Sequence, residues 1–491
     1  MTQPKHTHPL GYVDHTAKQL KDYWFLIILV VWQWASLSPL LRTGAVLVVL
    51  VWLLIWPLLQ WFSVTYLITP TAIVVHSGIF VRHHRHIPYA RLQTVQRKQW
   101  FYLRPFHLET LQIETASHQD GEPEVKLRAV PTTVADTIED YRQAAQLGPQ
   151  PAPTTAAAEP VPATPSETVA VPDGPVEHSY VIDHHALSLF ALTSTGVIPL
   201  LVALLWLYGK LPHKLTDSLI DDAAHFALPL IVGGVVLVLL VAWIIAYLWV
   251  LIRYYRFTLT STSDHLQIAK GFFQRNTISA PLDRVQAVRC KQNILRQWLH
   301  IQTIQVLLAS KAATGDNDHD LVILPAIDQQ ALYPTLHPFI DWVPASAPTL
   351  TDLKVTPWGR WLLCRNAVLF VALPVLLLCL FLRPWGLLSL LLLPIAILQG
   401  LFAGHNTGGT RLNDQLLVLQ TGHFWTRETF FVPRDQIQSM KLTWSVWLPK
   451  HNLAHLAVNV RHGNHNQEIE LRYIPADQAQ ALYAWYLASA R

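Results

Sequence analysis

Six apolar stretches of about the length needed to cross a bilayer constrain this chain more than any other feature. A helix rises about 1.5 Å per residue, so roughly 20 apolar residues span the hydrocarbon. The stretches are residues 23–41, 44–62, 187–208, 226–252, 361–382 and 385–403. Only 14% of the residues are charged, against roughly a quarter in soluble proteins. We therefore expect much of the surface to face lipid.

The apolar stretches come in three pairs. Arg42-Thr43 joins the first pair and Arg383-Pro384 joins the last, and such short links allow only tight helical hairpins. The middle pair has a longer connection around residues 210–225. Because each pair crosses and returns, every large polar segment is expected on one side of the membrane.

Basic residues beside the stretches predict which side this is. Cytoplasmic flanks of membrane spans carry an excess of Lys and Arg. The flanking basic residues are Lys18, Lys21, Arg253, Arg256, Lys354 and Arg360. They predict a multi-pass protein of the cell (plasma) membrane with its large domains in the cytoplasm, and the opposite orientation is the alternative.

The polar segments share one spaced pattern, which indicates an internal repeat. A glycine is followed by a proline 10, 10 or 11 residues later, and a glutamine stands five residues after each proline. These landmarks are Gly78, Pro88 and Gln93, then Gly271, Pro281 and Gln286, then Gly422, Pro433 and Gln438. A second proline closes each copy, at Pro131, Pro325 and Pro475. A repeat of this length sets the architecture before any single motif does.

Within each copy, local patterns predict a small antiparallel β domain closed by a helix. Residues 66–75 are typical of a strand, a turn and a strand, and Gly78 can turn the chain at positive φ. Residues 107–115 alternate apolar and polar, as a half-buried strand does. The second proline suits the first turn of a helix, where its missing N–H costs nothing.

The paired stretches, the Gly-x(3)-Arg and Pro-x-x-Arg-h-Gln-x-h patterns (h, apolar) and the closing helix resemble a known family. It is the bacterial pleckstrin-homology-like (bPH2-type) domains of membrane proteins of the YdbS and YdbT type. The resemblance covers nearly the whole chain except the linker. It implies that each polar segment is a seven-stranded, partly open barrel closed by a C-terminal helix. Copy three has Gln436 where the others have Arg91 and Arg284, so a role of that arginine does not extend to it.

The predicted fold is therefore mixed: six transmembrane α-helices in three hairpins, and three PH-like antiparallel β-barrel domains, each capped by a C-terminal helix. The expected segments are a cytoplasmic N-terminal tail (1–22), hairpin 1 (23–62), PH-like domain 1 (63–147), a linker (148–178), hairpin 2 (187–252), PH-like domain 2 (253–343), hairpin 3 (361–403) and PH-like domain 3 (404–491). The linker is rich in Pro, Ala and Thr, and such a composition predicts a disordered spacer.

Arginine residues near the landmarks are the candidate lipid-binding or partner-binding residues. They are Arg82, Arg85, Arg91, Arg275, Arg284 and Arg427. The inner membrane surface is anionic, and each nearby Lys or Arg contributes about 1 kcal/mol of attraction. These residues could therefore dock on anionic headgroups. The alternative is that the recurring arginines stabilise the fold through bidentate hydrogen bonds.

The run His83-His84-Arg85-His86 suggests a metal site at first sight. Successive side chains of a strand point to opposite faces, and no carboxylate or cysteine lies close in sequence. We therefore predict a solvated basic strand with no metal. Catalytic motifs and cofactor-binding motifs are also missing from the sequence, and no Asp or Glu lies in an apolar stretch, which argues against proton-coupled transport.

These observations predict an integral-membrane scaffold or interaction protein that is not an enzyme and needs no cofactor. By the family resemblance, its domains bind peptides, partner domains or lipid headgroups. The expected partners are the lipid bilayer with its anionic headgroups and another membrane protein with PH-like domains. The net charge of +4 gives no support to nucleic-acid binding. The alternative is a transporter or lipid-handling protein, whose path would be lined by polar residues of the six stretches such as Gln33, Gln60, Asn366 and Gln399.

Overall fold

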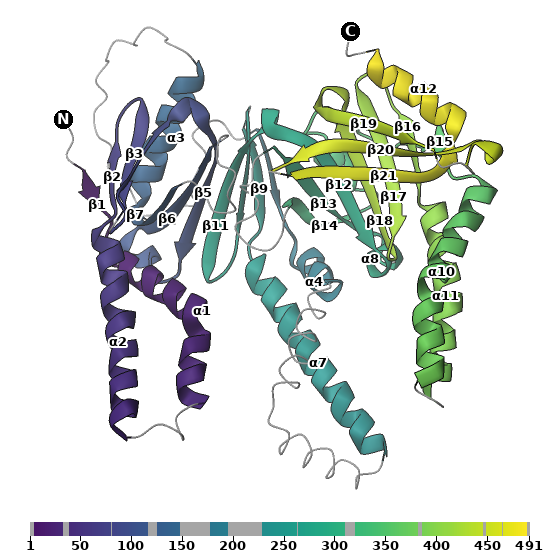
Figure 1. The fold of residues 1–491 in the computed structure, drawn as a ribbon. Helices are drawn as coiled ribbons and strands as arrows, with labels where there is room; N and C mark the ends of the chain where they lie inside the picture. The colour runs from purple at the N-terminus through teal and green to yellow at the C-terminus, as the bar shows by residue number, and fades with distance from the viewer. Residues whose placement is uncertain are drawn as a thin grey trace. The chain divides into compact units, whose positions relative to one another are not determined.

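The computed structural model describes residues 4–32, 39–79, 81–115, 125–147, 177–194, 228–262, 264–309, 320–381, 385–444, 448–463 and 465–488. They form two compact units, Met1–Glu177 with Gln267–Pro281, and His178–Leu266 with Leu282–Arg491. Figure 1 labels the helices and strands of both. The second copy of the repeat contributes strands to each unit.

The first unit contains copy one of the repeat. Its first sheet is antiparallel, in the order β1 (Lys5–His6), β2 (Thr65–Ile68), β3 (Ala72–Ser77) and β4 (His83–Pro88). Its second sheet contains β5 (Leu92–Trp100), β6 (Leu108–Thr115) and β7 (Val125–Pro131). Helix α3 (Thr132–Leu147) closes the core. Ile73, Leu111 and Ile138, from the two sheets and α3, are all fully buried, so the three elements share one core.

Copy two has the same number of strands. Its strands are β8 (His178–Val181), β9 (Thr258–Thr262), β10 (His265–Lys270), β11 (Gln274–Pro281), β12 (Val285–Asn293), β13 (Ile301–Leu308) and β14 (Leu321–Asp328). The short helices α8 (Ile294–Trp298) and α9 (Leu332–Leu336) follow β12 and β14. Strand β11 lies beside β5 in the first unit, and β12 to β14 belong to the second.

Copy three completes the second unit. Its first sheet contains β15 (Leu353–Lys354), β16 (Gly408–Arg411), β17 (Leu416–His423) and β18 (Thr426–Pro433). Its second sheet runs in the order β19 (Ile437–Thr443), β20 (Leu453–His462) and β21 (His465–Pro475). Helix α12 (Ala476–Leu487) packs its buried Leu482 and Trp485 into this core.

Each helix pair is inserted between the first two strands of a copy. In copy one, α1 (Gly11–Trp32) and α2 (Pro39–Phe62) separate β1 from β2. In copy two, α4 (His184–Leu192) and α7 (Leu228–Arg253) separate β8 from β9. In copy three, α10 (Pro357–Phe381), the 3₁₀ helix η6 (Trp385–Leu391) and α11 (Leu392–His405) separate β15 from β16.

The two strands that flank each helix pair are hydrogen-bonded to each other. Lys5 lies opposite Tyr66, His178 opposite Ser261 and Leu353 opposite Gly409. Paired strands are about 5 Å apart, so the chain enters and leaves each helix pair at the same place. The first strand also brings each copy to seven strands, the number that the family resemblance implies.

Among the described residues, three helices are long and apolar enough to cross a membrane, at Val236–Arg253, Pro357–Phe381 and Gly386–His405. A shorter apolar helix is found at Leu47–Phe62. The six crossings expected from the sequence therefore stay a prediction. The expected linker, 148–178, lies outside the described residues except at its end, where His178 already begins β8.

Several helix bounds differ from the sequence expectation. Helix α1 begins at Gly11 and has a kink at Tyr23, the residue at which the first apolar stretch was expected to begin. Asp14 on its first turn forms an ion pair with Arg128 of β7 at 2.8 Å. Arg42-Thr43 is not a turn, since both residues lie inside α2. The third expected span, 187–208, is not one continuous helix, because α4 ends at Leu192; residues 195–208 lie outside the described residues.

The closing helix is found as expected in copies one and three, where it follows Pro131 and Pro475 directly. The expectation is wrong at Pro325, which lies inside β14. Strand β14 continues to Asp328 because that residue still pairs with Ile301 of β13. The helix that follows, α9, has only five residues.

The landmark glycines have two different roles. Gly78 and Gly271 turn the chain at φ 109° and 111°, a conformation that side chains with a Cβ rarely adopt. Gly422 lies inside β17, where a Cβ would come 2.8 Å from Cβ of Asn406. In copy three the turn is made instead by Phe424 and Trp425, both at positive φ, which accounts for its one extra residue between glycine and proline.

Candidate functional site: the strand joints between repeated domains

The first joint connects copy one to copy two inside the first unit. Strand β5 pairs antiparallel with β11 over six residue pairs, from Val95 opposite Ser279 to Trp100 opposite Gln274. The side-chain amide of Gln96 donates to Oδ1 of Asn276 at 2.9 Å across the joint. The joint therefore consists of backbone hydrogen bonds supported by polar side chains.

Beyond the paired strands, the tip of the β10–β11 hairpin contacts copy one. The backbone N–H of Phe101 donates to the Phe273 carbonyl at 2.8 Å, and the Arg104 guanidinium donates to the Phe272 carbonyl at 3.0 Å. The rings of Phe101 and Phe273 meet edge to face, with centroids 6.2 Å apart. This second contact fixes how far β11 extends along β5.

The second joint connects copy two to copy three inside the second unit. Strand β12 pairs antiparallel with β18, from Val288 opposite Phe431 to Asn293 opposite Thr426. The hairpin tip is again held, since the Gln297 amide donates to the Trp425 carbonyl at 3.4 Å. Both joints thus use the fifth strand of one copy and the fourth strand of the next.

Both joints have the same register when residues are counted from the landmarks. The residue two places after the landmark glutamine lies opposite the residue two places before the landmark proline. These pairs are Val95 with Ser279 and Val288 with Phe431. A one-residue slip would turn every side chain to the other face, so the shared register indicates one joint geometry used twice.

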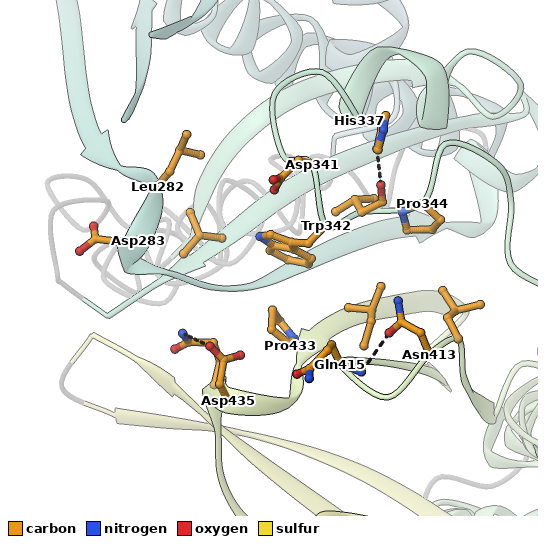
Figure 2. Close-up of a pocket in the computed structure, with 15 residues that line it drawn as sticks. Leu282, Asp283, His337, Asp341, Trp342, Pro344, Asn413, Gln415, Pro433 and Asp435 are labelled. Carbon is orange, nitrogen blue, oxygen red and sulfur yellow. Dashed lines mark hydrogen bonds between the residues drawn. The ribbon is translucent and has the colours of Figure 1, made fainter. Parts of the chain in front are cut away.

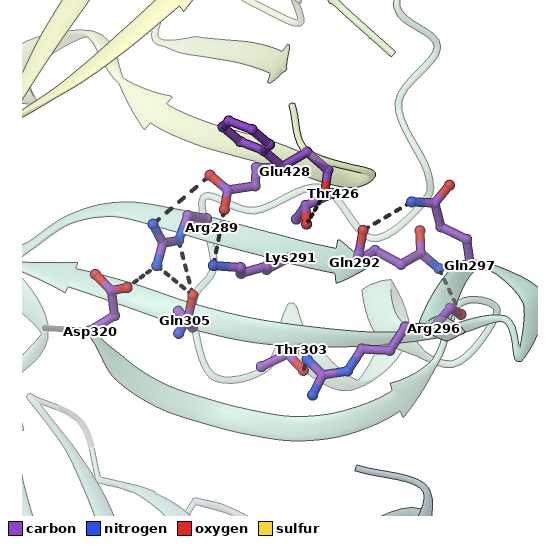
Figure 3. A network of polar contacts seen from close by, with 11 residues as sticks. Arg289, Lys291, Gln292, Arg296, Gln297, Thr303, Gln305, Asp320, Thr426 and Glu428 are labelled. Atoms are coloured by element: carbon purple, nitrogen blue, oxygen red, sulfur yellow. Dashed lines mark hydrogen bonds and ion pairs between the residues drawn. The ribbon is translucent and has the colours of Figure 1, made fainter. Parts of the chain in front are cut away.

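Charged side chains stabilise the second joint, and Figure 3 shows the network. Oε1 of Glu428 on β18 lies 3.3 Å from Nζ of Lys291 on β12, and its other oxygen lies 4.0 Å from Arg289. The Arg289 guanidinium also contacts the Asp320 carboxylate and donates to Oε1 of Gln305 at 3.0 Å. Burial lowers the pKa of Arg289, and the nearby Glu428 carboxylate opposes this shift.

A second cluster at the far end of β12 connects the joint to helix α4. The Arg296 guanidinium donates to the hydroxyls of Thr193, just after α4, at 3.0 Å and of Thr303 at 2.6 Å. It also lies 4.8 Å from the ring centroid of Phe190 in α4. Burial lowers the pKa of Arg296 to about 10. The end of the helix is therefore held by the domain that contains the joint.

A pocket of about 720 Å³ lies beside the second joint (Figure 2). Val285 at the start of β12 and Pro433 at the end of β18 line it, together with Trp342. The three lining carboxylates are those of Asp283, Asp341 and Asp435. Within the described parts of the chain, no group of three or more His, Cys, Asp and Glu side chains could hold a metal ion.

The comparisons with known proteins agree with this architecture. The family model for the bacterial PH domain matches three regions, residues 20–146, 223–337 and 359–490. The chain belongs to the bacterial PH domain family. It is also 26% identical to the UPF0699 transmembrane protein YdbT of Bacillus subtilis (strain 168), over 99% of this chain and 98% of that protein. No solved structure matches the chain significantly.

The landmark residues mark the same place in all three bacterial PH domains. Pro88, Pro281 and Pro433 end the fourth strand, and a 3₁₀ turn leads from each of them into the fifth strand. Gln93, Gln286 and Gln438 are the second residues of those fifth strands. The side chain of Gln286 is buried whereas that of Gln438 is exposed. The landmark proline and glutamine therefore mark the end of the fourth strand and the start of the fifth strand, the two strands that form the joints.

The candidate arginines divide between the joints and the surface. Arg275 lies in β11 opposite Gln99, and Arg427 in β18 donates to the side-chain oxygen of Gln292. Burial lowers the pKa of Arg427. Both residues therefore take part in contacts between PH domains of this chain.

The other candidate arginines lie outside the joints. Arg82 and Arg91 are exposed on either side of β4, and Arg85 is half-buried within that strand. Arg284 is exposed and lies 3.5 Å from the Asp283 carboxylate. Among the described residues, no contact given above joins these four arginines into one cluster.

Sequence reasoning missed Glu428 and with it the second joint, where its basic partners are Arg289 and Lys291. Glu428 is distant in sequence from both of its partners, and nothing local marks the pair. The repeat itself could have pointed to this position in the sequence. Glu428 precedes its landmark proline by the same number of residues as His83 and Asn276 precede theirs.

Replacing Glu428 with alanine should loosen the second joint. Loss of a buried charged partner costs about 1–3 kcal/mol, so the amides of β12 and β18 should exchange hydrogen roughly 5- to 100-fold faster. Mass-detected hydrogen exchange of the full chain in detergent measures this. The control is Glu468→Ala on β21, whose side chain is exposed; equal protection of β12 in both variants would contradict the stabilising role of Glu428.

Proposed function

We propose that this chain is a multi-pass membrane protein that presents three PH domains in the cytoplasm and uses them to hold partner polypeptides, without catalysis. Three helices of sufficient length and apolarity support the membrane location, as does the relative named a transmembrane protein. The basic residues beside the helices support the cytoplasmic orientation.

The strand pairing across each helix pair supports placing all three PH domains on one side. A helix pair that began on one side and ended on the other would separate its flanking strands by a bilayer thickness of about 30 Å. The pairs β1–β2, β8–β9 and β15–β16 are hydrogen-bonded instead. Each excursion into the membrane therefore returns to its starting point.

The single observation that carries the interaction role is the repeated joint. In this chain a PH domain binds the next PH domain by adding a strand to its sheet, with the same register both times. Strand addition supplies affinity through backbone hydrogen bonds and specificity through alternate side chains. A domain that binds its own kind within one chain is suited to binding it between chains.

Polar residues of the helices support the scaffold over the transporter. The side chain of Gln60 lies 3.1 Å from His15, Asn366 donates to the Tyr473 hydroxyl at 2.6 Å, and Gln399 accepts from the Trp425 N–H at 3.2 Å. These groups, which would line a transport path, connect the helices to the PH domains or to each other. Gln33 lies outside the described residues.

The pocket gives no support to catalysis by a side-chain nucleophile. Its described lining contains three carboxylates and His337, but neither a hydroxyl nor a thiol nucleophile, nor any Lys or Arg. Nδ1 of His337 is engaged with the Val343 carbonyl at 2.6 Å, as the dashed line in Figure 2 marks. Covalent catalysis by a hydroxyl, thiol or amine nucleophile would need such a group directed into the pocket.

Affinity isolation of the cross-linked full chain from native membranes tests this proposal. We expect a second membrane protein with a bacterial PH domain to be enriched over the same isolation from untagged cells. Recovery of the chain alone, or accumulation of a transported solute when the chain is deleted, would contradict the scaffold role.

Anionic headgroups are the second ligand that we propose, because Arg82 and Arg91 are exposed on both sides of β4, near His83, His84 and His86. Hydrogen exchange of β4 can be compared in nanodiscs of neutral and of anionic lipid. Headgroup contact predicts slower exchange in the anionic discs, and Arg82→Gln with Arg91→Gln should remove the difference. Equal exchange in both discs for the unmodified chain would contradict headgroup binding.

A further inference from the structure

Two strands take no part in the two joints although their counterparts in other domains do. They are β4, the fourth strand of domain 1, and β19, the fifth strand of domain 3. Each joint pairs the fifth strand of one PH domain with the fourth strand of the following domain. Within residues 1–491, β4 belongs to the first PH domain and β19 to the third. Among the described residues, both strands stand at the end of their sheets.

Strand β19 exposes the positions that its counterpart buries at a joint. Lys441 is exposed, whereas the equivalent Arg289 of β12 is only 8% exposed. Trp444 is 46% exposed, whereas the equivalent Gln292 is 2% exposed. A tryptophan on an open strand edge is the residue type that most often anchors a protein interface.

The stretch of β19 that corresponds to the joints starts at Met440, the counterpart of Val288. The hydroxyl of Tyr486 on α12 donates to the Gln438 carbonyl at 3.4 Å, before this stretch begins. An added strand along Met440–Trp444 would therefore not have to displace that contact.

A second copy of this chain is poorly matched to β19. In the shared register, Lys441 would face Arg85 of another copy's β4, and Met440 would face His86. Like charges directly opposite each other destabilise a strand pair. The two internal joints place Arg289 opposite Phe430 and Gln96 opposite Ile278 at this position, so neither contains such a repulsion.

Strand β4 has the features of a protected edge. Its exposed His83, His84 and His86 flank Arg85, and Arg82 precedes the strand. Charged side chains on an edge strand discourage pairing with other chains. β19 contains a single basic residue, Lys441, and no proline, so it remains the more open edge of the two.

We propose that Met440–Trp444 is a docking edge for the fourth strand of a PH domain carried by a different polypeptide. The incoming strand adds antiparallel in the register of the two internal joints. Its residue three places before the landmark proline faces Lys441 and is acidic or apolar. This inference rests on the proposed function and specifies the surface and the class of partner.

Site-specific photo-cross-linking in cells tests the docking edge. Benzoylphenylalanine replaces Lys441 in the full chain, and Glu468 on the opposite edge strand of the same sheet in a matched control. Both variants should unfold at the temperature of the parent chain, because both side chains are exposed. We expect position 441 to cross-link a different chain with a bacterial PH domain, at or next to the third residue before its landmark proline.

Four results would overturn the docking edge: a cross-link from position 441 to a second copy of this chain, a cross-link to lipid alone, a cross-link to a PH domain outside its fourth strand, and no product at that position. A PH-domain partner that is captured from position 468 but not from 441 would leave the proposed function standing. Absence of any PH-domain partner at both positions and in the affinity isolation would overturn both proposals.

Discussion

Backbone hydrogen bonding between strand edges is the interaction on which the rest of this molecule depends. It acts inside each PH domain, where the first strand pairs with the second across an inserted helix pair. It acts again between domains, where fifth and fourth strands pair in one register. Backbone pairing needs no particular side chain, so diverged copies can keep the same joint. Side chains then stabilise each joint in a different way. At the second joint, Glu428 interacts with both Arg289 and Lys291.

The inserted helix pairs link membrane and domain mechanically. The helices leave and re-enter a sheet at neighbouring strands, so each helix pair is attached directly to the first two strands of its domain. Further contacts reinforce the link, including Asp14 with Arg128 at 2.8 Å and Asn366 with Tyr473 at 2.6 Å. These contacts hold the helices against the PH domains.

The repeat could be predicted from the sequence because proline in all three copies, and glycine in the first two, occupy positions with strict backbone requirements; the domain type followed from the family resemblance. Pro88, Pro281 and Pro433 each end a strand ahead of a 3₁₀ turn, so their spacing survives divergence. The first strand of each domain could not be predicted, because two to four residues ahead of a helix pair have no periodicity of their own. The joints also escaped prediction, since pairing between Glu428 and Lys291 is a property of two distant segments. The turn expected at Arg42-Thr43 failed because both residues tolerate a helix.

The central claim is that every helix pair returns the chain to its starting side. Single cysteines are placed at exposed positions before and after each helix pair, at Lys5 and Thr71, His178 and Asp264, and Lys354 and Arg411. They can be probed with a membrane-impermeant maleimide, with the unmodified chain as the baseline for the three native cysteines. The account predicts no added labelling at any of the six positions in intact cells and labelling of all six after lysis. Labelling of one member of a pair in intact cells, with its mate protected until lysis, would contradict it.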